Sequence, residues 1–267
     1  MSKHPGDHGF AHSMTDLMAG VAVTFLLLAA IFMIQAGRAN AAAQKVAAKA
    51  QLVVKKTKTE DSEVRARLMA LRDKIGPIAQ IDASDPFLLV VTFETVKWFE
   101  TGQCELQPAI VKSIQDSVVT EIRKVCSHEY LGDINSVVLE GHTDPLPFLD
   151  KNRRCGGVEE CPSHNPAACV DIGFRNNVRL SAARAQEVFF EARKTLEKDD
   201  RPLIDTCFDK FFVVAGRGPA DSLSGVDWRD VGAVGSLSRT TLAQDRRVVL
   251  KVRFRSPRVS GTDEPAP

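Results

Sequence analysis

The middle of the chain contains the run Val138-Leu139-Glu140-Gly141-His142-Thr143-Asp144, in which apolar residues give way to polar ones. The apolar residues complete a predicted strand, Ile134–Leu139, and the polar residues follow at its end. Glu140 and His142 could act as an acid–base pair. Because the sequence offers no nucleophile or metal-ligating set around them, we predict a structural role for both instead.

Further strands and helices alternate on both sides of this run. Phe87–Phe93 is continuous, apolar and rich in β-branched residues, which is typical of a buried strand. The apolar patterns also predict strands at 211–215 and 248–254, and helices at 108–125 and 175–196. Strands alternating with helices predict an α/β sandwich, a mixed sheet with helices on one face, over residues 85–255.

The composition is that of an ordinary globular protein, with a net charge of +1 and 44% hydrophobic residues. The sequence lacks the basic excess that would indicate a nucleic-acid partner. It shows no catalytic set, so we predict no enzyme activity, no cofactor and no bound metal. The polar tail 256–267 contains Pro and Gly and is predicted to be disordered.

Near the N-terminus, Leu17–Ile34 is an uncharged apolar run. At about 1.5 Å per residue, a helix of this length covers about 27 Å, close to the hydrocarbon thickness of a bilayer. We therefore predict a transmembrane helix at 13–36, preceded by a short polar tail at 1–12. A cleaved signal peptide is the other interpretation, with Ala39-Asn40-Ala41 as the cleavage site.

Asp16 lies at the mouth of this apolar run, where a carboxylate is costly. Ser13-Met14-Thr15-Asp16 fits a capping box, and an acidic first turn suits the helix dipole. Alternatively, Asp16, Gly20 and Thr24 line up on one side of the helix. Such a small, polar stripe suits contact with another helix, or a relay for protons or sodium ions. The two interpretations are compatible, and physical reasoning from the residues leaves both open.

The segment 37–76 is predicted to be a helical linker, because it is rich in Ala, Lys, Arg and Glu and ends at Gly76-Pro77. A weak coiled-coil seam runs along it, interrupted by Thr57 and Glu60. The seam residues are Val46, Ala50, Val53, Val64, Leu68, Leu71 and Ile75. This pattern allows either a dimeric coiled coil or a single solvated helix.

The six cysteines all follow the apolar run, which indicates an oxidising compartment and up to three disulfides of open pairing. They are Cys104, Cys126, Cys155, Cys161, Cys169 and Cys207. A metal cluster of Cys155, Cys161, His164 and Cys169 is an alternative, although its spacing matches no standard zinc signature. Basic residues after the apolar run would weakly place the C-terminal part in the cytoplasm. We give the cysteines more weight and predict that the C-terminal part lies outside the cytoplasm.

Several motifs resemble those of OmpA-like peptidoglycan-binding domains, and they occur in the family's order over residues 88–255. The matching segments are Phe99-x-x-Gly102-x-x-Glu105-Leu106-x-Pro108, Val138–Asp144, Asn177-x-x-Leu180-Ser181-x-x-Arg184-Ala185, Gly216-x-Gly218 and Asp245-Arg246-Arg247-Val248. Each motif alone is modest, and their order makes the resemblance specific.

The resemblance implies a pocket for the diaminopimelate of the peptidoglycan stem peptide. This group carries an ammonium and a carboxylate on one small centre, which a carboxylate and a guanidinium can read together. Asp144 and Arg184 match the family's positions for these two roles. Asn177 and Arg247 are weaker candidates, expected to shape the pocket. The other interpretation is a surface salt bridge between Asp144 and Arg184 that closes a loop.

Two features depart from the family pattern. The connection at 145–176 is much longer than usual and carries Cys155, Cys161 and Cys169, so it could wall the pocket, cover it or bind another molecule. Gln244-Asp245 stands where the family has Asn before the paired arginines. This second departure puts the local turn in question.

The N-terminal part resembles MotB and its relative ZorB of Zorya anti-phage defence. The matching stretch is Ser13-Met14-Thr15-Asp16-Leu17-Met18-Ala19. The resemblance implies that Asp16 carries the translocated H+ or Na+, with protons weakly favoured. It also implies that two copies of the chain stand within a ring of MotA- or ZorA-like subunits. The implied location is the bacterial inner membrane, with one span, a cytoplasmic N-terminus and a periplasmic C-terminal domain.

Together these resemblances predict the peptidoglycan-anchored B subunit of an ion-driven rotary motor. The cysteine-rich connection 145–176 and the sequence around Asp16 favour a Zorya-type motor over a flagellar MotB-type one. The alternative from a different class is a static wall-anchored membrane protein in which Asp16 is only a helix cap.

Overall fold

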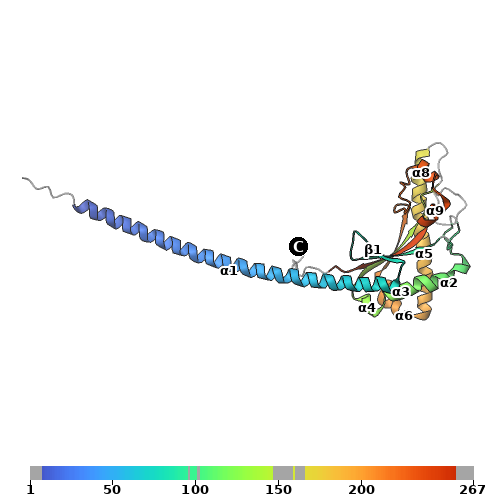
Figure 1. Cartoon of the computed structure of the whole chain (residues 1–267), viewed down its shortest axis with the longest axis horizontal. Helices are drawn as coiled ribbons and strands as arrows, with labels where there is room; N and C mark the ends of the chain where they lie inside the picture. Colours follow the sequence, from blue (N-terminus) through green and yellow to red (C-terminus); the bar gives the residue numbers. More distant parts are fainter. Residues whose placement is uncertain (1–7, 96, 101–102, 147–158, 160–165, 257–267) are drawn as a thin grey trace, which may run out of the picture. The chain divides into compact units, whose positions relative to one another are not determined.

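The computed structural model describes residues 8–95, 97–100, 103–146, 159 and 166–256 (Figure 1). The chain divides into two compact units. One is built on the residues up to Thr59, and the other runs from Glu60 to Pro257.

The first unit is helical, and it holds the part of helix α1 (His8–Ile75) that precedes Glu60. Its large apolar side chains between Leu17 and Ile34 are exposed, Phe25 and Phe32 at 69% each. An exposed apolar surface of this extent marks a site of membrane or protein contact. Among the described residues, α1 is the one helix long and apolar enough to cross a membrane. Side chains before Leu17, that of Asp16 included, lie outside those that the structure describes.

The second unit contains a five-stranded sheet in the order β1-β2-β5-β3-β4. The strands are β1 (Ala79–Ile81), β2 (Leu88–Glu94), β3 (Ile134–His142), β4 (Phe212–Gly218) and β5 (Arg247–Phe254). Strands β3 and β4 are parallel, and the other neighbours are antiparallel. The mixed sheet, following a long apolar helix, confirms the predicted OmpA-like α/β fold class.

Both predicted helical regions of this unit are helical in the structure. One is divided into several short helices, and the other is longer than predicted. The predicted helix 108–125 is a succession of η1 (Pro108–Ile110), α2 (Val111–Ile114), η2 (Gln115–Val119) and α3 (Thr120–Val125). The predicted helix 175–196 is the middle of α5 (Pro166–Asp199). The remaining helices are α4 (His128–Leu131), α6 (Arg201–Leu203), η3 (Ile204–Phe208), α7 (Asp209–Phe211), α8 (Val231–Gly235) and α9 (Arg239–Asp245).

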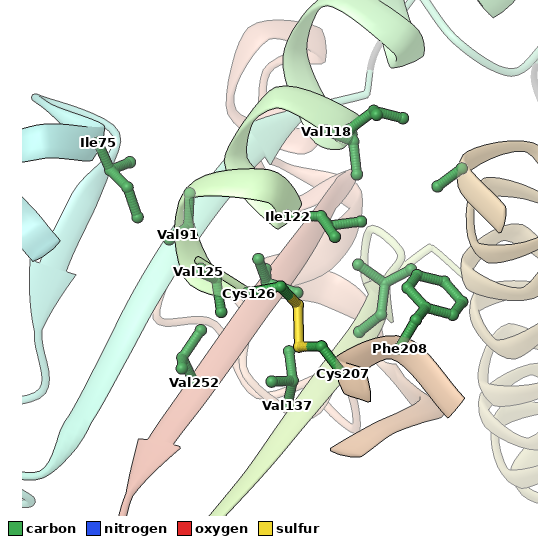
Figure 2. Close-up of a cluster of buried hydrophobic side chains, with 14 of the residues drawn as sticks. Ile75, Val91, Val118, Ile122, Val125, Cys126, Val137, Cys207, Phe208 and Val252 are labelled. Atoms are coloured by element: carbon green, nitrogen blue, oxygen red, sulfur yellow. A yellow bond between two sulfur atoms is a disulfide. The ribbon is translucent and has the colours of Figure 1, made fainter. Parts of the chain in front are cut away.

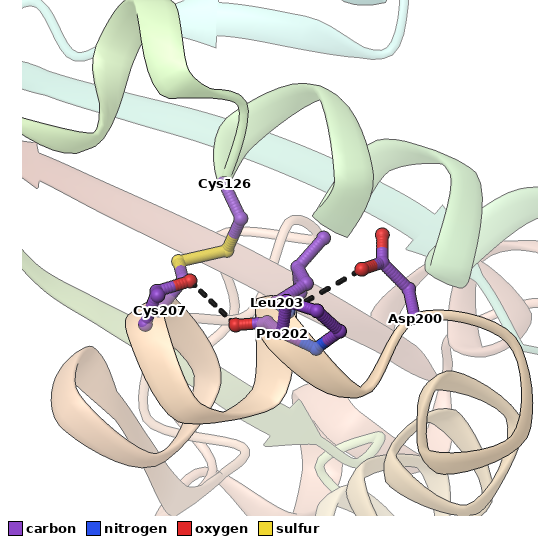
Figure 3. The surroundings of a disulfide bond; sticks show 6 residues. Cys126, Asp200, Pro202, Leu203 and Cys207 are labelled. Atoms are coloured by element: carbon purple, nitrogen blue, oxygen red, sulfur yellow. Dashed lines mark hydrogen bonds between the residues drawn. A yellow bond between two sulfur atoms is a disulfide. The ribbon is translucent and has the colours of Figure 1, made fainter.

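The core of the sheet domain is closed on one side by a disulfide. Cys126, after α3, is bonded to Cys207 of η3, and Figure 2 shows this bond among Ile122, Val137 and Phe208. These three residues are at most 1% exposed. Beside the bond, the carboxylate of Asp200 accepts a hydrogen bond of 3.3 Å from the amide of Leu203, which caps α6 (Figure 3). The bond therefore joins two helical segments that pack over the same core.

The last turns of α1 belong to this core. Leu68 and Leu71 are fully buried, Val64 and Ile75 nearly so, and all four are members of the sheet domain's hydrophobic cluster. The second half of the predicted seam is therefore buried within the chain itself, and the compact unit begins at Glu60. Val46, in the first half of the seam, is 68% exposed. The helix ends at Gly76, whose φ of 100° suits a residue without Cβ.

Candidate functional site

Helix α5 lies directly on the carboxyl ends of β3 and β4 because glycines line the contact. A Cβ on Gly141 would lie 1.9 Å from the carbonyl oxygen of Ser181, and one on Gly216 would lie 2.5 Å from that of Val178. The buried Ser181 hydroxyl accepts a hydrogen bond of 2.9 Å from the amide of Gly218, whose φ is +57°. These contacts give a physical reason for the glycines and serine of the three motifs.

Asp144 follows β3 at this edge of the sheet. Its side chain is 20% exposed, and its Oδ2 lies 3.4 Å from Nε of Arg246. Its Oδ1 accepts a hydrogen bond of 3.2 Å from the amide of Leu146. Burial raises the pKa of Asp144, while the charge of Arg246 and the bond from Leu146 act in the opposite direction. The carboxylate thus has two partners and remains partly exposed to solvent.

Arg184, on α5, is only 4% exposed. Its Nε donates to the carbonyl of Gln103 at 2.9 Å, and an Nη donates to that of Glu100 at 3.2 Å. Its guanidinium lies 5.1 Å from the ring centroid of Phe99. Arg184 therefore holds the segment before α2, and its charge lowers the pKa of Asp144. Among the described residues, Asp144 forms its ion pair with Arg246.

Asn177 orients the loop that carries Asp144. The side-chain amide of Asn177 donates to the carbonyl of Leu146 at 2.7 Å and to that of Asp144 at 3.4 Å. Asn177 is 3% exposed. These two bonds tie α5 to the loop after β3.

Asp245 lies in the turn where Gln244-Asp245 departs from the OmpA-like pattern, and its side chain is bonded to the loop after β4. It is fully buried, and its carboxylate accepts hydrogen bonds from the Ser222 hydroxyl at 2.7 Å and the Leu223 amide at 2.5 Å. Arg247 lies 3.9 Å from the same carboxylate and donates to the carbonyl of Asp221 at 2.6 Å. Burial lowers the pKa of Arg247, against the charges of Asp245 and Asp221. Both residues fix the loop after β4.

The long connection 145–176 is partly helical, since α5 begins at Pro166. Its ring of Phe174 stacks on Trp228 with centroids 4.2 Å apart. The backbone of Glu159 is held on both sides by the amide of Asn176, and its carboxylate pairs with Arg175 at 2.6 Å. These contacts hold Glu159 of the connection to α5 and hold Phe174 to Trp228. Residues 147–158 and 160–165 lie outside the described part.

Glu140 and His142 lie side by side on β3. Nε2 of His142 is 3.5 Å from Oε2 of Glu140, and Nζ of Lys251 is 2.7 Å from the same oxygen. Burial acts to raise the pKa of Glu140, but its neighbours His142 and Lys251 outweigh this and lower it to about 2. Burial lowers the pKa of His142, which keeps the imidazole neutral at pH 7.

The described cysteines are all oxidised. Cys126 pairs with Cys207, and Cys104 and Cys169 are each disulfide-bonded. Cys169 is therefore not a thiolate ligand, which counts against the alternative zinc cluster. The other members of that cluster, Cys155, Cys161 and His164, lie outside the described residues.

The structure thus brings Asp144, Asn177 and the loop of Arg247 to one edge of the sheet, with Arg184 behind it. Sequence reasoning missed Arg246, the guanidinium nearest to Asp144. Its position directly before β5 was the available signal, because successive residues of an extended segment point to opposite sides.

No protein-family model and no curated protein matches the sequence. Solved structures that are similar to parts of the chain include the cell wall anchor of the T6SS from Pseudomonas aeruginosa, at 19% identity and a TM-score of 0.38, covering 71% of this chain and 96% of that one. A protein described as MotB-like from Desulfovibrio vulgaris has 16% identity and a TM-score of 0.40, covering 77% and 98%. The periplasmic domain of Helicobacter pylori MotB has 12% identity and a TM-score of 0.40, covering 66% and 76%. The fold assigned above stands on the chain's own strand order and register.

Proposed function

We propose that this chain is a peptidoglycan-anchored membrane subunit, the B subunit of an ion-driven rotary motor. The observation that carries the anchoring part is the arrangement around Asp144. The carboxylate of Asp144 accepts a hydrogen bond from the Leu146 amide, on a loop whose backbone carbonyls are bonded by Asn177, and it lies 3.4 Å from the guanidinium of Arg246. Paired opposite charges of this kind suit a ligand that carries an ammonium and a carboxylate on one centre, as diaminopimelate does.

In this pocket, Asp144 receives the ligand's ammonium. The ligand's carboxylate then takes the place of Asp144 as the partner of Arg246. The buried guanidinium of Arg184 adds positive charge near this position. Nε of Arg246 is buried, and its contact with Oδ2 of Asp144 at 3.4 Å is an ion pair without hydrogen-bond geometry, so a ligand oxygen would give this donor a hydrogen bond. Asn177 and Arg247 shape the pocket without touching the ligand.

Binding to purified sacculi tests the anchoring part. The full chain in detergent should pellet with sacculi, and combined Asp144→Ala and Arg184→Ala substitution should release it. Arg217→Ala is the matched control, because Arg217 is an exposed arginine paired with Asp221 on the same edge. Pelleting of the double variant at the wild-type level would refute the pocket assignment.

The membrane part of the proposal rests on Asp16 and the exposed apolar helix that follows it. The helix would cross the inner membrane once, with the N-terminus in the cytoplasm and the sheet domain in the periplasm. Two copies within a ring of MotA-like or ZorA-like subunits would let Asp16 carry H+, or Na+, as the ring turns. The wall-bound domain would keep the helix pair still, so that ion flow produces rotation of the ring.

Replacing Asp16 by Asn tests the motor separately from the anchor. Asp16→Asn keeps the size and the capping oxygen but removes the titratable group. The variant should abolish motor-dependent function in cells while retaining sacculus binding. Wild-type function of this variant would leave a static wall anchor, the alternative function, as the better account.

Among such motors we favour a Zorya-type defence system over a flagellar one. The support is the cysteine-bearing connection 145–176 and the sequence Ser13–Gly20 around the proposed ion-carrying position, Asp16. Expression with its genomic neighbours should then protect cells from phage in an Asp16-dependent way. Restoration of swimming to a stator-deficient strain, without protection, would instead identify a flagellar subunit.

A further inference from the structure

Three side chains that the pocket does not use form a cluster at the end of β3. Glu140 and His142 project from β3, and Asp221 lies in the turn after β4. Each offers one ligand atom, and these atoms all lie within 4.8 Å of one another. Glu140 and His142 are buried, whereas the side chain of Asp221 is 42% exposed. The cluster is therefore closed toward the core and open toward solvent at Asp221.

His142 is the member that points to a ligand. The residue is only 3% exposed, and neither of its ring nitrogens has a hydrogen-bond partner among the described residues. Leaving a buried polar atom without a partner costs about 1–3 kcal/mol. Its Nε2 points at Glu140, 3.5 Å from Oε2, which is long for a hydrogen bond. That separation is close to the spacing of two ligand atoms on one tetrahedral ion with bonds of about 2.0–2.2 Å.

Cationic side chains also surround the cluster. Nζ of Lys251 lies 2.7 Å from Oε2 of Glu140, and Arg217 pairs with Asp221 at 3.0 Å. The guanidinium of Arg247 donates a hydrogen bond of 2.6 Å to the backbone carbonyl of Asp221. Lys251 thus occupies the position of a cation beside Glu140, and its side chain, 26% exposed, can move into solvent.

We propose that Glu140, His142 and Asp221 bind a divalent transition-metal ion, with Zn2+ as the probe. One neutral imidazole and two carboxylates supply a charge of −2, and a water molecule from the open side would complete four-coordination. The imidazole favours a transition metal over Mg2+ or Ca2+, which prefer oxygen ligands. The ion takes the place of the Lys251 ammonium and breaks the exposed pair between Arg217 and Asp221, which is worth little.

The bound ion joins the end of β3 to the turn after β4, next to the loop that carries Asp144. Because the ligands come together only in the folded chain, metal binding stabilises the fold. The proposal does not depend on peptidoglycan binding, so each can fail without the other.

The test measures thermal unfolding of the sheet domain in the full chain, in detergent, after chelation and then at increasing Zn2+. The wild-type midpoint should rise with Zn2+, and His142→Gln should abolish the rise. Lys251→Gln should shift the half-saturating Zn2+ concentration at least about fivefold lower, because a competing cation is gone. His128→Gln is the matched control and should behave like wild type, since His128 is an exposed histidine on α4.

The histidines of the N-terminal segment are common to the wild type and all the variants, so the comparison uses the unfolding midpoint and not total zinc uptake. If His142→Gln does not fold, the Zn2+ responses of Lys251→Gln and Asp221→Asn test the proposed site instead. Asp221→Asn should weaken Zn2+ binding at least about tenfold. A wild-type midpoint that does not respond to Zn2+ would overturn the proposal. So would a rise that persists unchanged in His142→Gln or in Asp221→Asn.

Discussion

Gly141 lets α5 lie against the sheet with no side chain between them. Gly141 directly precedes His142 and lies three residues before Asp144, so the same contact that fixes the helix also fixes the strand end on which the candidate site is built. The glycine is required for close approach, since its backbone has no unusual φ.

Gly141→Ala should therefore unfold the domain or destabilise it severely, by about 3 kcal/mol or more, because its Cβ would overlap backbone of α5 that cannot move aside. Denaturant unfolding of the full chain measures the change in the free energy of unfolding. Gly132→Ala is the matched control: a Cβ there has open space and the backbone is right-handed helical, so its effect should stay within about 0.5 kcal/mol. Similar effects of the two substitutions would contradict the close-approach argument.

At the scale of single residues, the sequence identified Asp144 and Asn177 through the motifs, and the structure places both at one edge of the sheet. It could not assign Arg246 and Asp221, because their roles depend on which loops meet after β4. Arg184 was expected to face a ligand, and its buried contacts with Glu100 and Gln103 depend on a segment some 80 residues away in sequence.

At the scale of elements, the apolar runs predicted the main strands and helices correctly, and the differences have physical causes. β3 continues through Glu140 and His142 because β5 and β4 pair with its polar end. The spacing of Val64, Leu68, Leu71 and Ile75 reports a buried helix face without saying what buries it. A partner helix and the chain's own sheet satisfy that pattern equally, and the structure assigns these four residues to the sheet domain.

Leu68→Ala should lower the free energy of unfolding of the sheet domain by about 2–5 kcal/mol, because a fully buried side chain is removed from its core. Met69→Ala, one residue further and 47% exposed, should change it by less than about 0.5 kcal/mol. Chemical denaturation of both variants makes the comparison. If Leu68→Ala is as stable as Met69→Ala, the end of α1 is not part of the domain core.

At the scale of the whole molecule, two units of different chemistry share one helix. The first exposes apolar side chains over a length that suits a bilayer, and the second is a disulfide-closed α/β domain with a charged edge. The sequence predicted a membrane helix, a helical linker and a sheet domain, and the two compact units of the structure meet between Thr59 and Glu60. What joins the two units in function is the proposal that a wall-bound domain holds a membrane helix still.

The most direct measurement of this central claim is calorimetric binding of two synthetic stem peptides to the full chain in detergent. One peptide ends in meso-diaminopimelate and the other in L-lysine, which keeps the side-chain ammonium and lacks the second carboxylate. The diaminopimelate peptide should bind saturably, at least about tenfold more tightly than the lysine peptide, and Asp144→Ala should abolish the binding. Equal affinity for the two peptides, or no binding of the diaminopimelate peptide, would contradict the account.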